Sequence, residues 1–224
     1  MTHPLAVVLL DGEPFASALA DALGKPVYPV TVATIDDTVR ELAAETPHIV
    51  GLSAWPWPAN HGIHQTLGGN HDAYRGVVSW HGLPELAHAL ADALKGAVSH
   101  QAHVLFTSPD PGDDATADTL MFLPQLAEQV SAQVNPGGRS IAWRGERRQP
   151  SSVAAFTALV EAHAVTTIVE CPVVPGVAPD ETLRASALAR GVTFVATDLG
   201  VATRVGLMRQ VVHTVEQVEW NQPD

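Results

Sequence analysis

Histidine is concentrated in one stretch of the sequence. Six of the eleven histidines lie between His48 and His88, and His61, His64 and His71 fall in a run rich in Trp, Pro, Asn and Gly. The Pro and Gly content predicts a loop rather than a helix for that run. Imidazole is the commonest protein ligand for transition metals, and it exchanges protons near neutral pH. The stretch therefore predicts metal binding or proton transfer.

Other side chains near this run have compatible chemistry. Asp11 follows the first apolar run of the chain and would offer an oxygen ligand to Fe²⁺ or Co²⁺. Trp55, Trp57 and Trp80 flank the histidine-rich run. Either these indoles stack on a flat ligand, or they pack the run onto a sheet with their N–H groups hydrogen-bonded.

The chain is acidic, with 24 Asp and Glu against 12 Lys and Arg and a net charge of −12. This balance argues against a nucleic-acid partner, which requires a basic face. A small basic cluster nevertheless occurs at Arg144, Arg147 and Arg148. It either attracts a carboxylated ligand, since guanidinium pairs well with carboxylates, or forms a solvated turn.

The sequence also lacks several features. No apolar run reaches the length of about 18 residues that a membrane span needs, and residues 1–14 lack the basic region of a signal peptide. We therefore expect a cytoplasmic protein. The single cysteine, Cys171, excludes an internal disulfide and is expected to be buried. Neither a phosphate-binding loop nor a Gly-x-Ser-x-Gly elbow is present, so no organic cofactor is expected.

Short apolar runs alternate with helical patterns along the whole chain. The continuous apolar run Leu5–Leu10 is typical of a strand covered on both faces, and the run at Ile49–Leu52 leads into the histidines. Such alternation predicts parallel sheets with right-handed crossovers. Ligands of open α/β sheets bind beyond the carboxyl ends of the strands, which is where the histidines fall.

The pattern occurs twice. Arg75-Gly76-Val77 in the first half matches Arg190-Gly191-Val192 in the second, and each precedes a long helical pattern. We predict an α/β protein of two similar βαβαβ halves with parallel sheets and a cleft between the halves. The N-terminal half, residues 1–97, carries the histidine-rich run, and residues 98–224 form the C-terminal half. Because such a chain can form its cleft alone, we expect a monomer or a weak homodimer.

At these residues the sequence resembles the class II chelatases of tetrapyrrole synthesis, the CbiX-type sirohydrochlorin and cobalt chelatases. The resemblance covers most of the chain as an order of elements, but its motifs are short. Gly62-Ile63-His64 is similar to the family's Gly-x-His loop after the third strand. Glu146, which precedes Pro150-Ser151, is similar to the family's glutamate before Pro-Ser.

The resemblance implies a site and a reaction. His64 and Glu146 would be the catalytic residues, His64, His61 and Asp11 would hold the metal, and Arg147 and Trp57 would contact the tetrapyrrole. The activity implied is that of a lyase of cobalamin or siroheme synthesis, which inserts Fe²⁺ or Co²⁺, as its substrate, into sirohydrochlorin or a related tetrapyrrole.

The sequence departs from the family pattern at three places, which keeps other functions open. Asp11-Gly12 stands where the family has His-Gly, Thr107-Ser108 stands there in the second half, and Ala178 replaces the second Gly-x-His histidine. One alternative is a catalytically degenerate chelatase-fold protein that binds a metal or tetrapyrrole as carrier or sensor. Another is an unrelated metal-dependent hydrolase or dioxygenase, whose ligands would come from Asp11, His61, His64 and His71.

Overall fold

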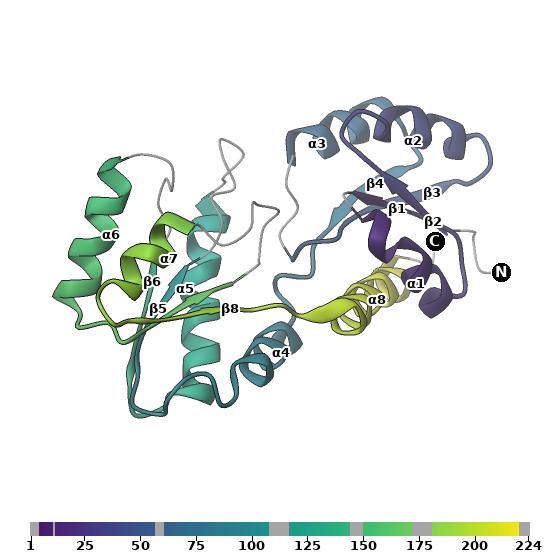
Figure 1. Ribbon diagram of the computed structural model, residues 1–224. Helices are drawn as coiled ribbons and strands as arrows, with labels where there is room; N and C mark the ends of the chain where they lie inside the picture. Colours follow the sequence, from purple (N-terminus) through teal and green to yellow (C-terminus); the bar gives the residue numbers. More distant parts are fainter. Residues whose placement is uncertain are drawn as a thin grey trace. The chain divides into compact units, whose positions relative to one another are not determined.

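Two parallel sheets form the framework of the protein, which we describe from a computed structural model (Figure 1). The structure describes residues 5–10, 12–56, 61–107, 117–143, 150–171 and 181–219; within them a few side chains, including those of His61 and His64, are not described. The predicted fold class is confirmed, because each half of the chain forms a four-stranded parallel sheet. The cleft expected between the halves stays a prediction.

The first sheet has the strand order β2-β1-β3-β4. Its strands are β1 (Leu5–Leu10), β2 (Val27–Val30), β3 (His48–Ser53) and β4 (Tyr74–Val78). The helices that follow them in turn are α1 (Glu13–Leu23), α2 (Ile35–Ala43), α3 (His61–Asn70) and α4 (Pro84–Leu94).

The second sheet repeats this order as β6-β5-β7-β8. Its strands are β5 (His103–Thr107), β6 (Arg139–Trp143), β7 (Thr167–Glu170) and β8 (Thr193–Ala196). Its helices are α5 (Ala117–Val134), α6 (Pro150–Ala162), α7 (Glu181–Leu188) and α8 (Gly200–Glu219). The internal repeat predicted from the sequence is therefore present as a repeated topology.

One element was predicted wrongly. The run that contains His61 and His64 was expected to be a loop because of its glycines, but residues His61–Asn70 form helix α3. Gly68 and Gly69 each weaken an isolated helix by about 1 kcal/mol relative to Ala, which is why the pattern indicates a loop. Leu67 is only 2% exposed and belongs to the core of this half, so its burial stabilises the helix.

The cores follow from the central strands. Every residue of β1 is buried, as expected for a continuous apolar run in the middle of a parallel sheet. One core cluster lies around Val8, Val39 and Ile49 in the first half. A separate cluster lies around Leu105 and Phe156 in the second.

The chain divides into two compact units that are not consecutive halves. Unit 1 comprises Met1–Leu83 and Gly200–Asp224, and unit 2 comprises Pro84–Leu199. The boundary expected at residues 97 and 98 separates the two sheets, but the last helix of each half is exchanged. Helix α8 packs against α1 in unit 1, and α4 packs against α5 in unit 2.

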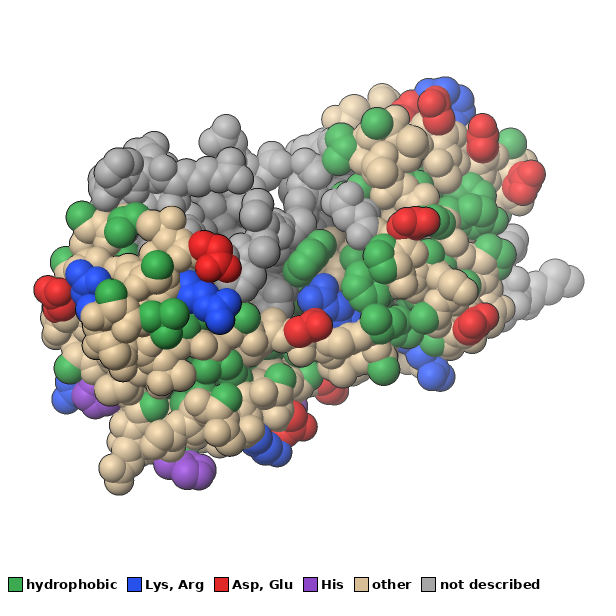
Figure 2. All heavy atoms as spheres, viewed as in Figure 1, with side chains coloured by type: hydrophobic (Ala, Val, Ile, Leu, Met, Phe, Trp, Pro, Cys, Tyr) green, Lys and Arg blue, Asp and Glu red, His purple; other side chains and the backbone are tan. Residues whose placement is uncertain are grey.

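Charged side chains are distributed in small groups. On the face that Figure 2 shows, basic and acidic side chains lie among hydrophobic and uncharged surface. Several bases pair locally: Arg40 binds Asp36 and Asp37, and Lys95 binds Asp92. Within the ranges given above, no helix is both long and apolar enough to cross a membrane.

Candidate functional site

At the carboxyl edge of the first sheet, Gly12 lies directly before α1. Gly12 is buried between β1 and α1, and a Cβ atom at this position would lie 2.1 Å from Cγ of Leu9, which is itself 0% exposed. The chain therefore needs glycine directly after Asp11, the residue that replaces the first histidine of the chelatase pattern. Asp11 itself lies outside the described residues.

The end of β3 is fixed by hydrogen bonds to its neighbour and to itself. The backbone N–H of Ala54 donates to the carbonyl oxygen of Leu10 at 3.2 Å, which extends the pairing with β1. The N–H of Trp55 donates to Oγ of Ser53 at 3.1 Å. These bonds fix the backbone of residues 53–55 at the sheet edge.

Trp80, which follows β4, packs against this edge. Its indole is 0% exposed, and Nε1 donates to the carbonyl oxygen of Ser53 at 3.0 Å. For this tryptophan the packing interpretation is confirmed, since both its ring and its N–H are used inside the unit.

Arg204 of α8 is a buried cation at the same edge, and the sequence reasoning missed it. Arg204 is 6% exposed, and its guanidinium carbon lies 4.6 Å from the ring centroid of Trp55 and 5.6 Å from that of Phe15. Both distances are within cation–π range. The three residues are far apart in the sequence, so no local pattern connects them. The edge thus has a buried guanidinium beside a half-buried indole.

Two other histidines of unit 1, His71 and His81, contact side chains of the same unit. His71 Nε2 lies 3.1 Å from Oδ1 of Asp36 on α2. Nδ1 of His81 lies 2.7 Å from Oγ of Ser79. His71 was considered as a metal ligand, which stays a prediction, and its contact with Asp36 connects the end of α3 to α2.

The remaining predicted site residues stay predictions. His61 and His64 occupy the first turn of α3, but their side chains are not described. Trp57, Glu146 and Arg147 lie outside the described residues. Among the side chains that are described, no three from His, Cys, Asp and Glu come close enough together to hold a metal ion.

The corresponding edge of the second sheet carries a buried acid. Glu170 ends β7 with 6% of its surface exposed, and Thr107 ends β5 with 2% exposed. The sequence signal for Glu170 was its charge at the end of the apolar run that precedes Cys171. Cys171 is buried as predicted, and burial, with a smaller effect of the Glu170 charge, raises the pKa of its thiol to about 12.

Fold and edge together define an α/β protein with two repeated parallel sheets. Two repeated four-stranded parallel sheets each carry polar or charged groups at their carboxyl edge, which is the ligand-binding edge of open α/β sheets.

Comparison with solved structures supports this description of the fold. SirB from Bacillus subtilis, solved with Fe³⁺, superimposes with a TM-score of 0.65 at 14% sequence identity, over 98% of this chain and 98% of that chain. AraP, an arabinose-binding protein from Geobacillus stearothermophilus, gives a TM-score of 0.50 at 11% identity, over 99% of this chain and 90% of that chain. No family model and no curated protein sequence matches this chain.

Proposed function

We propose that the protein inserts a divalent metal, Fe²⁺ or Co²⁺, into sirohydrochlorin or a related tetrapyrrole. The observation that carries this proposal is the full-length similarity to SirB, a structure solved with Fe³⁺, together with the short sequence motifs of class II chelatases. The metal would be a substrate rather than a resident cofactor.

Helix α3 strengthens the assignment of His61 and His64. Residues three apart in a helix share one face, so the helical backbone places positions 61 and 64 one turn apart on the same face. A loop would impose no such relation. Both positions lie in the first turn of the helix that follows β3. Ligands of α/β proteins bind beyond the carboxyl ends of such strands.

The proposed chemistry needs ligands that release the metal and bases that accept protons. Insertion exchanges two pyrrole N–H protons for one divalent cation, so two protons leave for each metal bound. His64, His61 and Asp11 would hold the cation, and Glu146 and His64 would take the protons. Arg147 would pair with a carboxylate of the macrocycle, while Trp57 would contact its ring.

The test is to incubate the protein with sirohydrochlorin and Co²⁺ and to follow the absorption spectrum against a metal-only control. His64→Ala is expected to lower the insertion rate by about 100-fold, the usual range for loss of a general base. His88→Ala, an exposed histidine on α4, is the matched control and should leave the rate unchanged. An insertion rate no higher than that of the metal-only control would overturn the proposal.

A second candidate function is binding without turnover, as a metal or tetrapyrrole carrier or sensor. This function is favoured by Asp11, Thr107 and Ala178, because each stands where the chelatase family has a histidine. Calorimetric titration with Co²⁺ and with the tetrapyrrole separates the two functions. Saturable binding without the absorption change that metal insertion produces supports a carrier or sensor. Catalytic metal insertion excludes a function of binding alone.

A further inference from the structure

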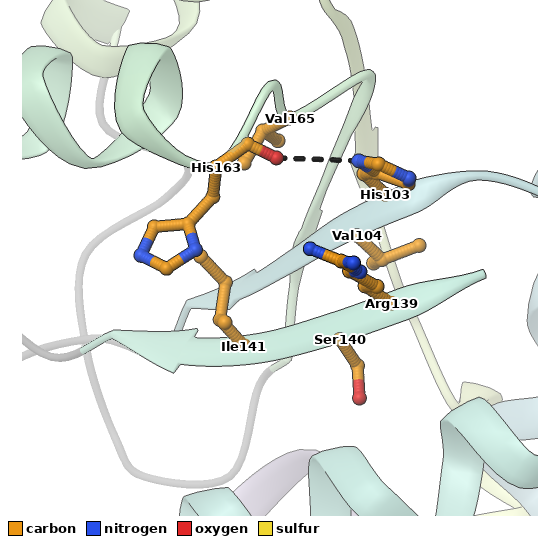
Figure 3. A pocket seen from close by; sticks show the side chains of 7 residues that line it. All are labelled: His103, Val104, Arg139, Ser140, Ile141, His163 and Val165. Atoms are coloured by element: carbon orange, nitrogen blue, oxygen red, sulfur yellow. Dashed lines mark hydrogen bonds between the residues drawn. The ribbon is translucent and has the colours of Figure 1, made fainter.

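A pocket of about 250 Å³ lies at the opposite, amino edge of the second sheet (Figure 3). It is formed within unit 2 by the start of β5, the first residues of β6 and the connection from α6 to β7. Its lining residues are His103, Val104, Arg139, Ser140, Ile141, His163 and Val165. The pocket is separate from the carboxyl edges, so the inference drawn from it is independent of the proposed function.

His103 is held in place by hydrogen bonds to the connection between α6 and β7. Nδ1 of His103 lies 3.2 Å from the carbonyl oxygen of His163. A carbonyl only accepts hydrogen bonds, so Nδ1 of His103 carries the proton and Nε2 is left for another partner. The backbone N–H of His103 also donates to Oγ1 of Thr166 at 3.0 Å, which anchors the start of β5.

Arg139 supplies a permanent positive charge on the same face. It is the register partner of His103, and paired residues of neighbouring strands project to the same side of a sheet. Figure 3 shows Ile141 reaching from β6 toward the His163 imidazole, with the Arg139 guanidinium on the same side of the strand. Arg139 makes no ion pair with any described residue, and the acid nearest the end of α6, Glu161, lies 3.6 Å from Arg190 instead.

The repeated unit shows that the fold does not require these bases. When the carboxyl ends of the strands are aligned, Trp143 corresponds to Val30, and the counterpart of Arg139 is therefore Pro26. Glu170 likewise corresponds to Ser53, so the counterpart of His163 is Thr46.

In the same alignment, strand β6 begins one residue earlier than β2, because the counterpart of Val27 is Ser140. The additional residue is Arg139, which lines the pocket. In a protein of net charge −12, the lining has one arginine, two histidines and no acid.

We propose that this pocket binds a small organic carboxylate with an aromatic or branched aliphatic body. The guanidinium of Arg139 suits a carboxylate, which it can bind through two parallel hydrogen bonds. The side chains of Ile141 and Val165 offer an apolar surface for the body of the ligand. An apolar cavity of about 150 Å³ is large enough to bind benzene, so this pocket has room for a ring and its carboxylate.

The test uses the full-length protein and benzoate as the probe, with binding followed by ligand-observed NMR at neutral pH. Benzamide has the same ring without the charge, and acetate has the charge without the ring, so both should bind at least about tenfold more weakly than benzoate. Inorganic phosphate distinguishes a general anion site, because it should not compete with benzoate.

Two variants decide the role of the arginine. Arg139→Gln should weaken benzoate binding about tenfold, the effect of losing a charge-assisted pair. Arg184→Gln, an exposed arginine on α7 of the same unit, should leave the affinity within about twofold. Circular dichroism should show both variants folded.

Three outcomes would overturn this inference. They are the absence of saturable benzoate binding, equal binding of benzoate and benzamide, and unchanged benzoate binding by Arg139→Gln. The last outcome combined with a lowered melting temperature would assign Arg139 to the stabilisation of the C-terminus of α6, where a cation favours the helix dipole.

Discussion

The carbonyl oxygen that ends the third strand of each sheet meets a different donor. In unit 1, the oxygen of Ser53 accepts from the indole N–H of Trp80 at 3.0 Å. In unit 2, the carbonyl oxygen of Glu170 accepts two hydrogen bonds from Thr197, one from Oγ1 at 2.6 Å and one from the backbone N–H of Thr197 at 3.1 Å. The two positions correspond, since Ser53 pairs with the last residue of β1 and Glu170 with the last residue of β5.

This difference separates what the repeated fold needs from what each site adds. The fold needs a hydrogen-bond donor for this carbonyl oxygen. An indole N–H supplies it in unit 1, and a hydroxyl and a backbone N–H supply it in unit 2. Unit 1 closes its carboxyl edge with a buried indole, while unit 2 has a buried carboxylate there. Topology is therefore shared by the two units, and chemistry is set by the residues just beyond the strands.

The largest effect on stability is expected when Trp80 of unit 1 is removed. Trp80→Ala removes a fully buried ring and leaves the Ser53 carbonyl without its donor, so it should lower the free energy of unfolding by about 3–5 kcal/mol. Thr197→Ala should cost only about 1 kcal/mol, because the backbone N–H of Thr197 still reaches Glu170. Urea unfolding followed by circular dichroism measures both, and equal losses would contradict this account.

An intermediate effect is expected from pH, through Cys171. Its backbone N–H donates to the carbonyl oxygen of Thr107, as that of Ala54 donates to Leu10, so alanine fills the same place in unit 1. Burial raises the pKa of the Cys171 thiol from 9.0 to about 12, so the unfolded chain releases this proton at a lower pH than the folded one. Stability should therefore fall as the pH rises from about 9, with a slope approaching about 1.4 kcal/mol per pH unit below pH 12.

Comparison with Cys171→Ala isolates this contribution, since the variant lacks the thiol and should lack its share of the slope. Equilibrium unfolding at several pH values between about 8 and 10 measures the difference. The native thiol should also resist iodoacetamide at pH 8, and rapid alkylation in the folded protein would contradict its burial.

The smallest effect on stability is expected in α3. Gly68→Ala should raise the free energy of unfolding by up to about 1 kcal/mol, because alanine favours a helix and a Cβ at this position meets no atom within 4 Å. If residues 61–70 were a loop, the substitution would give no such gain. Thermal unfolding against wild type measures it.

Most of the fold could be predicted from the sequence because apolar runs and helix patterns agree along the chain. The strand Leu5–Leu10 and the helix of α4 are examples in which periodicity and end signals coincide. Helix α3 could not be predicted, since its glycines oppose a helix and its stabilisation comes from burial of Leu67. The exchange of α4 and α8 has no local signal either, because it depends on contacts between distant segments.

The candidate site could be predicted only in part. Sequence motifs identify His64 and Glu146 by local spacing, and these residues stay predictions. The contacts of Arg204 with Trp55 and Phe15 bring together residues that are distant in the chain, so only the structure shows them. The pocket at Arg139 depends on the register of β6 against β5, which spacing alone does not give.

The exchange of the last helices has a consequence for how the chain reaches its folded state. Unit 2 is one uninterrupted segment, Pro84–Leu199, inserted between the two parts of unit 1. Once unit 2 has folded, its two ends are held at a set separation. This removes most of the entropy cost of closing that long segment when α8 docks on α1. During synthesis the sheet of unit 1 emerges early, but one face of α1 remains uncovered until α8 has been made. The first unit to begin folding would then be the last to finish.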